Sequence, residues 1–394
     1  MTTEELIVER FKPDLTCLPF RATTGTREEL AALFGELGFR AGAEIGVYRG
    51  WYSTRLCRNI PGLEITCVDW WKKSWRTSQF QMNENMRYAQ QMLAPYGARF
   101  IRKRSVEAAD DVPDGSLDFV YIDANHKYKS VKEDIVAWYG KVREGGIMAG
   151  HDYSHPHWPG QVEQAVREFT GTRGVKRWYI TAERLGSQIN PPSWFFVKPA
   201  TKELIVEKFG INGVSSAPLV ANRGDREELA VLFGELGFKT GAEIGVRKGW
   251  YSWRLCRNIP NLKLKCVDPW LAFRRNSQDK MDYYFEYAKK LLAPYDAEII
   301  KKTSEEAAKD VSDGSLDFVF IDAMHEYDSV LQDITLWTPK VRVGGIVSGH
   351  DYSKPNRYNG VVGAVKEYTM SHGIDEWYVT LEDNEHAPSW FWVK

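Results

Sequence analysis

The chain lacks the features that would direct it to a membrane, an oxidising compartment or nucleic acid. No apolar run reaches the roughly 20 residues of a membrane-spanning helix, and the first ten residues are polar and acidic, unlike a secretory leader. Only five of its 394 residues are cysteine, and none forms a Cys-x-x-Cys pair. This usage predicts a reduced, cytoplasmic protein. A net charge of −1 gives no reason to expect nucleic acid or a membrane surface as a partner.

What the sequence does contain is a long internal repeat. Residues 118–153 recur as residues 317–352 without a gap, and residues 25–153 keep the same offset of 199 throughout. A period of this length indicates a duplicated domain, since solenoid repeats are far shorter. We therefore predict two tandem domains, residues 1–198 and 199–394, each long enough to bury its own core.

Each copy alternates short apolar runs with segments of helical periodicity. The box Thr26-Arg27-Glu28-Glu29 predicts the capped start of a helix. The alternation predicts an α/β fold with a mostly parallel sheet and helices on both faces. In copy one the expected strands are 43–47, 65–68, 99–102, 119–122 and 147–149, followed by an antiparallel pair at 177–181 and 194–197.

Ionisable residues follow two of these strands directly. Asp123 and His126 come after the strand 119–122, and His151 and Asp152 come after the strand 147–149. The carboxyl ends of parallel strands are where such sheets bind ligands, so we expect these side chains to meet at one site. The second copy repeats the set as Asp322, His325, His350 and Asp351.

A glycine loop follows the first expected strand, with the pattern Glu44-x-Gly46-x-x-x-Gly50. A pyrophosphate-binding loop needs Gly-x-Gly-x-x-Gly, whereas bulky residues fill this one, which favours a ligand with an adenosine and no phosphate. Asp69, at the end of the next strand, lies where an acidic residue reaches ribose hydroxyls. The alternative is that Gly46 and Gly50 only form a tight turn. Copy two repeats the pattern with Glu243, Gly245, Gly249 and Asp268.

These motifs together resemble the class I S-adenosylmethionine-dependent methyltransferases. The resemblance covers nearly all of each copy and implies two tandem Rossmann-like domains, each with a seven-stranded sheet whose last strand is antiparallel. It implies that Glu44 and Gly46 lie near the methionine part of the cofactor, that Asp69 holds the ribose, and that Ser105 and Glu107 contact adenine. Gly50 and Asp123 are further implied cofactor residues. The implied cofactor residues of copy two are Glu243, Gly245, Gly249, Asp268, Ser304, Glu306 and Asp322.

The Asp-x-x-His and His-Asp motifs are similar to those of metal-dependent O-methyltransferases that act on macrolide sugars. The similarity implies that Asp123 and Asp152 hold a metal and that His126 is the general base. His151 stands where that family has a glutamate. As a further candidate ligand it would favour a transition metal over magnesium. A metal-free site with His126 as base stays open. In copy two the metal residues are Asp322, His350 and Asp351, and the base is His325.

We therefore expect transfer of a methyl group to oxygen of a small hydroxylated acceptor, with a sugar as the expected acceptor. Alternatives are an NAD-dependent oxidoreductase, a pseudodimer in which one half is not catalytic, and a methyltransferase acting on nucleic acid. We also expect an intramolecular pseudo-twofold pairing of the halves through the helices 4–11 and 203–209, whose apolar residues need cover. The loops after the second strand and after His-Asp-Tyr differ between the copies, which predicts different acceptors.

Overall fold

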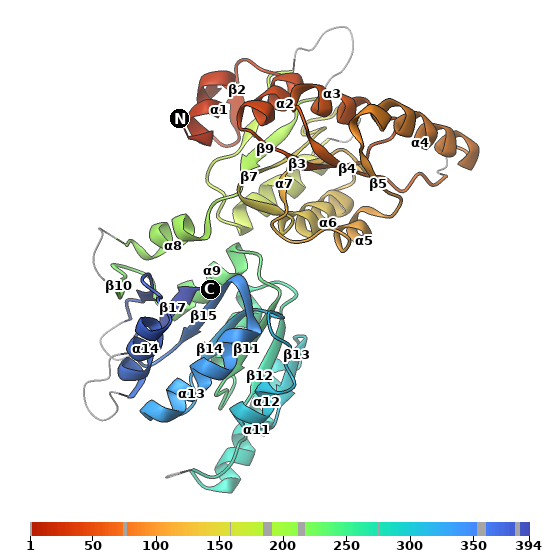
Figure 1. The fold of residues 1–394 in the computed structure, drawn as a ribbon. Coiled ribbons are helices and arrows are strands. Elements are labelled where there is room, and N and C mark those ends of the chain that lie inside the picture. The colour runs from red at the N-terminus through yellow and green to blue at the C-terminus, as the bar shows by residue number, and fades with distance from the viewer. Residues whose placement is uncertain are drawn as a thin grey trace. The chain divides into compact units, whose positions relative to one another are not determined.

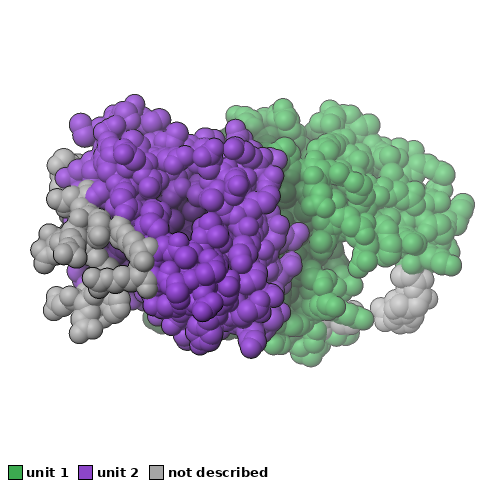
Figure 2. Space-filling view, turned by 90° about the horizontal axis from the view of Figure 1, so that it is seen from below, with its two compact units in different colours: residues 1–200 green, residues 201–394 purple. Residues whose placement is uncertain are grey.

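A computed structural model describes residues 2–73, 77–157, 159–183, 191–211, 217–273, 276–352, 360–382 and 387–394. The chain divides into two compact units, Met1–Ala200 and Thr201–Lys394 (Figures 1 and 2). No helix among the described residues is long and apolar enough to cross a membrane.

Unit 1 is built on a nine-stranded sheet in the order β1-β2-β8-β9-β7-β6-β3-β4-β5. The predicted seven strands are all present, and β9 runs antiparallel to both β7 and β8. The sequence did not predict β1 and β2, which extend one edge with only two and three residues. The strands are β1 (Pro13–Asp14), β2 (Phe20–Ala22), β3 (Ala41–Ile45), β4 (Glu64–Val68), β5 (Arg99–Ile101), β6 (Leu117–Ile122), β7 (Val142–Gly150), β8 (Tyr179–Ile180) and β9 (Trp194–Val197).

Unit 2 repeats this arrangement with eight strands in the order β10-β16-β17-β15-β14-β11-β12-β13. Its strands are β10 (Leu219–Val220), β11 (Thr240–Ile244), β12 (Lys263–Val267), β13 (Ala297–Ile300), β14 (Leu316–Ile321), β15 (Val341–Gly349), β16 (Tyr378–Val379) and β17 (Trp390–Val393). Its helices are α8 (Thr201–Phe209), α9 (Arg226–Glu235), α10 (Trp250–Asn258), α11 (Gln278–Leu292), α12 (Ser304–Ala308), α13 (Tyr327–Trp337), η2 (Thr338–Lys340) and α14 (Gly360–Ser371).

The helices of unit 1 form two apolar cores, one on each face of its sheet. The first core holds α1, α2, α3 and α4, and the second holds α5, α6 and α7. The predicted capping box is confirmed, because Thr26 and Glu29 cap the start of α2 reciprocally. The helices are α1 (Thr3–Phe11), α2 (Arg27–Glu36), α3 (Trp51–Asn59), α4 (Gln79–Leu93), η1 (Ala94–Tyr96), α5 (Ser105–Ala109), α6 (Tyr128–Tyr139) and α7 (Gln161–Thr172).

Some apolar residues of α1 and α8 pack on strands of their own units. Ile7 and Phe11 are fully buried, and the Phe11 ring lies 5.1 Å from that of Phe195 in β9. In unit 2 the Phe209 ring lies 5.2 Å from that of Phe391 in β17. Val206 of α8 remains 37% exposed. Pairing of the units through these helices stays a prediction.

Four backbone hydrogen bonds align the carboxyl ends of the central strands of unit 1. Each is donated by a residue just after one strand to the last residue of a neighbouring strand. The donor–acceptor distances are 2.8 Å for Gly46 to Val68, 2.7 Å for Asp123 to Ile45, 2.9 Å for His151 to Ile122, and 3.3 Å for Asp69 to Ile101. The loops after β3, β4, β6 and β7 therefore start side by side at one edge of the sheet.

Gly46 lies where the turn after β3 passes the end of β6. Its φ is +97°, and a Cβ atom there would lie 2.1 Å from the backbone oxygen of Asp123. Both the left-handed backbone and the close approach exclude a side chain. Gly245 repeats the feature against Asp322, at 2.2 Å. Gly46 thus lies in a tight turn that is packed on the backbone of Asp123, and its contact with a cofactor stays a prediction.

We predict that Gly46→Ala destabilises unit 1 by about 2–4 kcal/mol, because it combines a left-handed alanine with a backbone clash. Urea unfolding of the full chain should show the loss, and Gly245→Ala should show the same loss in unit 2. Gly171→Ala is the control, since Gly171 lies in α7 with open space around it. That change should stabilise by about 0.5–1 kcal/mol. Equal stability of Gly46→Ala and wild type would contradict the prediction.

Candidate functional site

A cavity of about 840 Å³ lies over the carboxyl ends of the central strands of unit 1. This volume is in the range of small-molecule sites, roughly 300–1,000 Å³. Of the residues predicted from the sequence, the cavity lining includes Gly46, Asp69, Ser105, Asp123 and His126. The lining does not include Glu44, Gly50, Glu107, His151 and Asp152.

Asp69 joins the two loops that border the cavity. Its carboxylate accepts hydrogen bonds from the backbone N–H groups of Tyr48 and Trp71, both at 2.8 Å. The Trp71 indole in turn donates to the Tyr48 carbonyl at 2.8 Å. Burial raises the pKa of Asp69, and these backbone hydrogen bonds oppose the rise. Unit 2 repeats the arrangement around Asp268. The sequence did not predict this structural role.

Glu44 is buried beneath the cavity and accepts a hydrogen bond from the Ser53 hydroxyl in α3. Burial raises the pKa of Glu44 to about 8, so its carboxyl group is largely protonated at neutral pH. Glu243 and Ser252 form the same pair in unit 2, and burial also raises the pKa of Glu243 to about 8. The sequence signal for Ser53 was its recurrence as Ser252.

The part of the cavity after β5 is formed by Ser105 and the neighbouring helix α6. Ser105 accepts a hydrogen bond from the Trp138 indole at 3.0 Å. Asp134, which the sequence analysis missed, also lines the cavity, and burial raises its pKa to about 6. The predicted adenine contact Glu107 is exposed outside the cavity lining. In unit 2 its equivalent Glu306 forms the capping box of α12 with Thr303.

Gly50 begins the helix that follows the glycine loop. It is the N-cap of α3 with a φ of +76°, and a Cβ atom there would lie 3.1 Å from Leu93 and 3.3 Å from Ala89 of α4. Gly249 holds the same position before α10. The second glycine of the motif therefore allows α3 to pack closely on α4.

The strand-end acids and His126 converge at one end of the cavity. Single ligand atoms of Asp123, His126 and Asp152 lie within 4.8 Å of one another. The closest pair is His126 Nδ1 and Asp152 Oδ2, at 2.9 Å. Asp152 has a φ of +59°, as does Asp351, and such backbone strain concentrates at functional sites. Unit 2 repeats the cluster with Asp322, His325 and Asp351.

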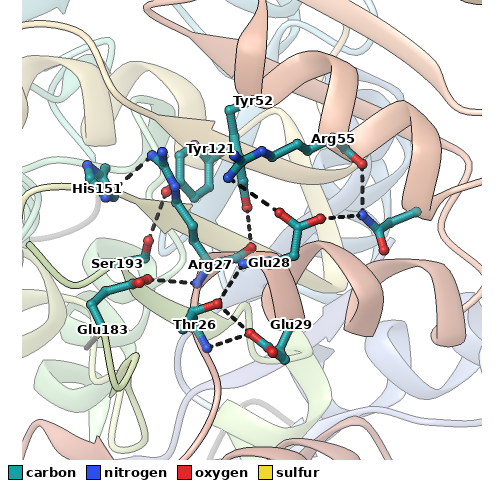
Figure 3. A network of polar contacts seen from close by, with 11 residues as sticks. Thr26, Arg27, Glu28, Glu29, Tyr52, Arg55, Tyr121, His151, Glu183 and Ser193 are labelled. Atoms are coloured by element: carbon teal, nitrogen blue, oxygen red, sulfur yellow. Dashed lines mark hydrogen bonds and ion pairs between the residues drawn. The ribbon is translucent and has the colours of Figure 1, made fainter. Parts of the chain in front are cut away.

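His151 lies behind this cluster, against Arg27 at the start of α2 (Figure 3). Its Nε2 atom lies 3.5 Å from the Arg27 guanidinium, and its Nδ1 atom lies 3.2 Å from Asp152. A guanidinium only donates, so Nε2 accepts and Nδ1 carries the proton that is shared with Asp152. Both ring nitrogens are thus engaged with protein groups, which is unfavourable for the predicted role of His151 as a metal ligand.

Arg27 is a site residue that the sequence analysis did not identify. Its guanidinium lies 5.3 Å from the centre of the Tyr52 ring, and Figure 3 shows it beside Tyr121 and His151. Its backbone N–H donates to Glu183 at 2.7 Å, which fixes the start of α2 next to the site. The only signal in the sequence was the capping box, which places residue 27 at a helix start without indicating what it faces.

The pKa values of Asp123, His126 and Asp152 shift for different reasons, which indicates different roles. Burial lowers the pKa of His126, but its hydrogen bond and charge interaction with Asp152, together with the charge of Asp123, raise it overall above 6.5. Burial raises the pKa of Asp152, yet the hydrogen bonds from His126 and His151 hold it well below the usual range. Burial raises the pKa of Asp123. Asp152 is therefore the anion that orients both histidines.

A family model for a methyltransferase domain matches the chain twice, at residues 43–153 and 242–352. The two matches together make up more than half of the chain. The chain belongs to this methyltransferase family. The prediction of two tandem class I methyltransferase domains is thus confirmed, and the NAD-dependent alternative is not favoured.

Two curated relatives match parts of the chain. An uncharacterized protein of Sinorhizobium fredii, y4gI, is 36% identical over 55 residues, 14% of this chain and 6% of that protein. An uncharacterized protein of Acanthamoeba polyphaga mimivirus, R132, is 24% identical over 135 residues, 32% of this chain and 57% of that protein. The chain therefore spans less than two thirds of the length of either relative.

Solved O-methyltransferases are similar to half of the chain. One from Bacillus cereus, solved in complex with S-adenosylhomocysteine, has 14% identity and a TM-score of 0.34, and covers 49% of this chain and 90% of that one. TomG from Streptomyces achromogenes, solved with S-adenosylmethionine, has 18% identity and a TM-score of 0.34, and covers 50% of this chain and 89% of that one.

We predict that Glu44→Gln changes the dependence of stability on pH. The folded chain keeps the Glu44 proton up to about pH 8, whereas the unfolded chain releases it near pH 4.3. The contribution of Glu44 to wild-type stability therefore falls as the pH rises between these values, by up to about 1.4 kcal/mol per pH unit. The glutamine cannot ionise, so the variant should gain stability relative to wild type over this range.

Urea unfolding at pH 5, 6, 7 and 8 measures this difference. Glu243→Gln is the matched variant in unit 2, because burial gives Glu243 the same pKa of about 8. A constant stability difference between wild type and Glu44→Gln across the four pH values would show that Glu44 is ionised in the folded chain.

Proposed function

We propose that each unit transfers a methyl group from S-adenosylmethionine to an oxygen atom of a small hydroxylated acceptor such as a sugar. The observation that carries this proposal is the His126–Asp152 pair at the end of the strand-edge cavity. It joins a candidate base to a cofactor-sized cavity within a methyltransferase domain. Unit 2 pairs His325 with Asp351 at 3.1 Å, there through the Nε2 atom of the histidine.

The cavity fits S-adenosylmethionine in size and in the chemistry of its lining. We assign the ribose to the acidic strand end at Asp69, the adenine to Ser105 and Asp134, and the methionine part to the turn at Gly46. Glu44 and Gly50 support this lining from outside the cavity. When bound, the cofactor supplies an electrophilic methyl carbon next to the acidic cluster. The bound S-adenosylhomocysteine and S-adenosylmethionine of the solved O-methyltransferases agree with this choice of cofactor.

We assign His126 as the general base, oriented by Asp152. A base must remove the acceptor proton as the methyl group arrives, and imidazole suits this work near neutral pH. The Asp152 carboxylate fixes the ring by its contact with Nδ1, so Nε2 is the nitrogen that faces the acceptor. The charge of Asp152 also stabilises the imidazolium that forms. His151 contacts Asp152 from behind and is itself in contact with Arg27.

The same cluster fits a divalent cation. Asp123, His126 and Asp152 offer two carboxylate oxygens and one imidazole nitrogen within 4.8 Å, a donor set that suits a transition metal better than magnesium. These three residues would hold the ion, and the ion would lower the pKa of the acceptor hydroxyl. His126 would then be a ligand and could not be the base. Activity after dialysis against EDTA separates the two mechanisms.

We also propose that the two catalytic domains are residues 1–198 and 199–394 and that they pair with pseudo-twofold symmetry. The boundary is supported by Lys198, whose backbone N–H still pairs with Gly146 of β7, while α8 begins at Thr201. Symmetric pairing is expected of duplicated domains.

We predict that the chain binds two molecules of S-adenosylhomocysteine. Each unit carries a complete set of strand-end residues, so calorimetry should give a stoichiometry near two. Asp69→Ala should remove one site, because it removes the ribose contact and releases the two loops that Asp69 holds. Asp268→Ala should remove the other. A wild-type stoichiometry of zero would rule out the proposed function.

We predict that His126→Ala reduces methylation by unit 1 by about 10²–10⁴-fold and leaves S-adenosylhomocysteine binding intact, because a base acts on the acceptor. His325→Ala is the matched change in unit 2. Wild-type activity should rise with pH above 6.5, since the pKa of His126 is raised and only the neutral ring accepts a proton. Full activity of both single variants on every acceptor would exclude these histidines as bases.

A further inference from the structure

The mouth of the cavity in unit 1 carries cationic side chains on three different loops. Lys72 follows β4, Arg104 follows β5 and Lys127 follows β6, and all three line the cavity and are exposed. The Trp70 ring lies between two of them, with Lys72 Nζ at 4.6 Å and Arg104 Cζ at 5.6 Å from its centre. We call Trp70, Lys72, Arg104 and Lys127 the cationic rim.

Three of the four acidic residues of the cavity lining are engaged below the rim, and the fourth, Glu133, is exposed and lies 3.9 Å from Lys129. Asp69 accepts two backbone hydrogen bonds, and Asp134 is buried with a pKa raised to about 6. Asp123 belongs to the cluster with His126. The fourth cation of the lining, Lys103, forms an ion pair with Asp111 at 2.6 Å. The rim therefore presents a net positive charge to an entering molecule, above an acidic floor.

Unit 2 replaces every member of the cationic rim. The equivalent positions are Pro269, Leu271, Thr303 and Glu326, and Val106 of the lining becomes Glu305. The lining of unit 1 has four cationic and four acidic residues, whereas the equivalent positions of unit 2 have two cationic and five acidic residues. The two cationic residues of unit 2 include Arg247, which stands where unit 1 has Tyr48 and partly offsets the loss of positive charge. The acidic cluster and Glu44, Asp69 and Asp134 are identical in the two units, whereas Tyr121, buried behind the cluster, is Phe320 in unit 2.

We propose that the cationic rim of unit 1 binds the phosphate group of a phosphorylated acceptor, and that unit 2 takes an acceptor without one. This inference rests on the proposed function. Arginine and lysine are the side chains that hold phosphate, and Arg104 can do so with two parallel hydrogen bonds. Trp70 offers a flat apolar face for the carbon skeleton next to that group. Lys127 is also the N-cap of α6, whose dipole favours an anion at this end, although its first N–H, that of Tyr128, already donates to Gln161 at 2.9 Å.

The test uses the full chain with both cofactor sites saturated by S-adenosylhomocysteine and inorganic pyrophosphate as the probe. Calorimetry at low salt should detect one pyrophosphate per chain, with an affinity that falls as salt is added. The variant K72L/R104T/K127E gives unit 1 the residues of unit 2 and should weaken this binding at least tenfold. The reciprocal variant L271K/T303R/E326K should create a second site.

A control with the same change of net charge is R10L/R21T/R177E, because none of these three arginines lines the cavity. It should bind pyrophosphate as wild type does. Absence of saturable binding to wild type, unchanged binding in K72L/R104T/K127E, or displacement of S-adenosylhomocysteine by pyrophosphate would each overturn the inference. If S-adenosylhomocysteine itself does not bind, the proposed function fails instead.

Discussion

The arrangement of each site depends on the contact between the turn after the first central strand and the end of its neighbour. In unit 1, Gly46 approaches the backbone of Asp123 more closely than any residue with a Cβ atom could. The Asp123 N–H in turn bonds to the last residue of β3 at 2.7 Å. Asp123 is thereby fixed beside the cavity, and His126 follows three residues later. A side chain at position 46 would separate the glycine turn from the acidic cluster.

The sequence was sufficient to predict most of the strands, which follow from local periodicity, and the residues that meet at the strand ends. The order of apolar runs predicted seven of the nine strands of unit 1, and the residues after β6 and β7 predicted the cluster of Asp123, His126 and Asp152. These predictions succeeded because parallel strands bring their carboxyl ends to one edge. The duplication helped, since residues repeated within diverged loops, such as His126 and His325, indicate a constraint on that position.

The sequence was insufficient for partners far apart in the chain. Nothing near His151 indicates that Arg27, 124 residues earlier, lies against its ring. Glu107 and Glu306 matched the expected spacing after β5, but a residue at the third position of a helix can cap the helix instead of reaching a ligand, as Glu306 does. Asp69 was expected to face a ribose, and its bonds to two loops depend on backbone conformations at Tyr48 and Trp71 that the sequence does not reveal.

The duplication also separates the parts of the site that carry chemistry from those that select the ligand. Neither member of the buried Glu44–Ser53 pair can change singly without leaving its partner unsatisfied, and both units retain this pair. The rim residues are exposed, so each substitution costs little stability, and there the units have diverged from lysine and arginine to leucine, threonine and glutamate. A duplicated enzyme can therefore acquire a second acceptor by changing surface charges around an unchanged catalytic centre.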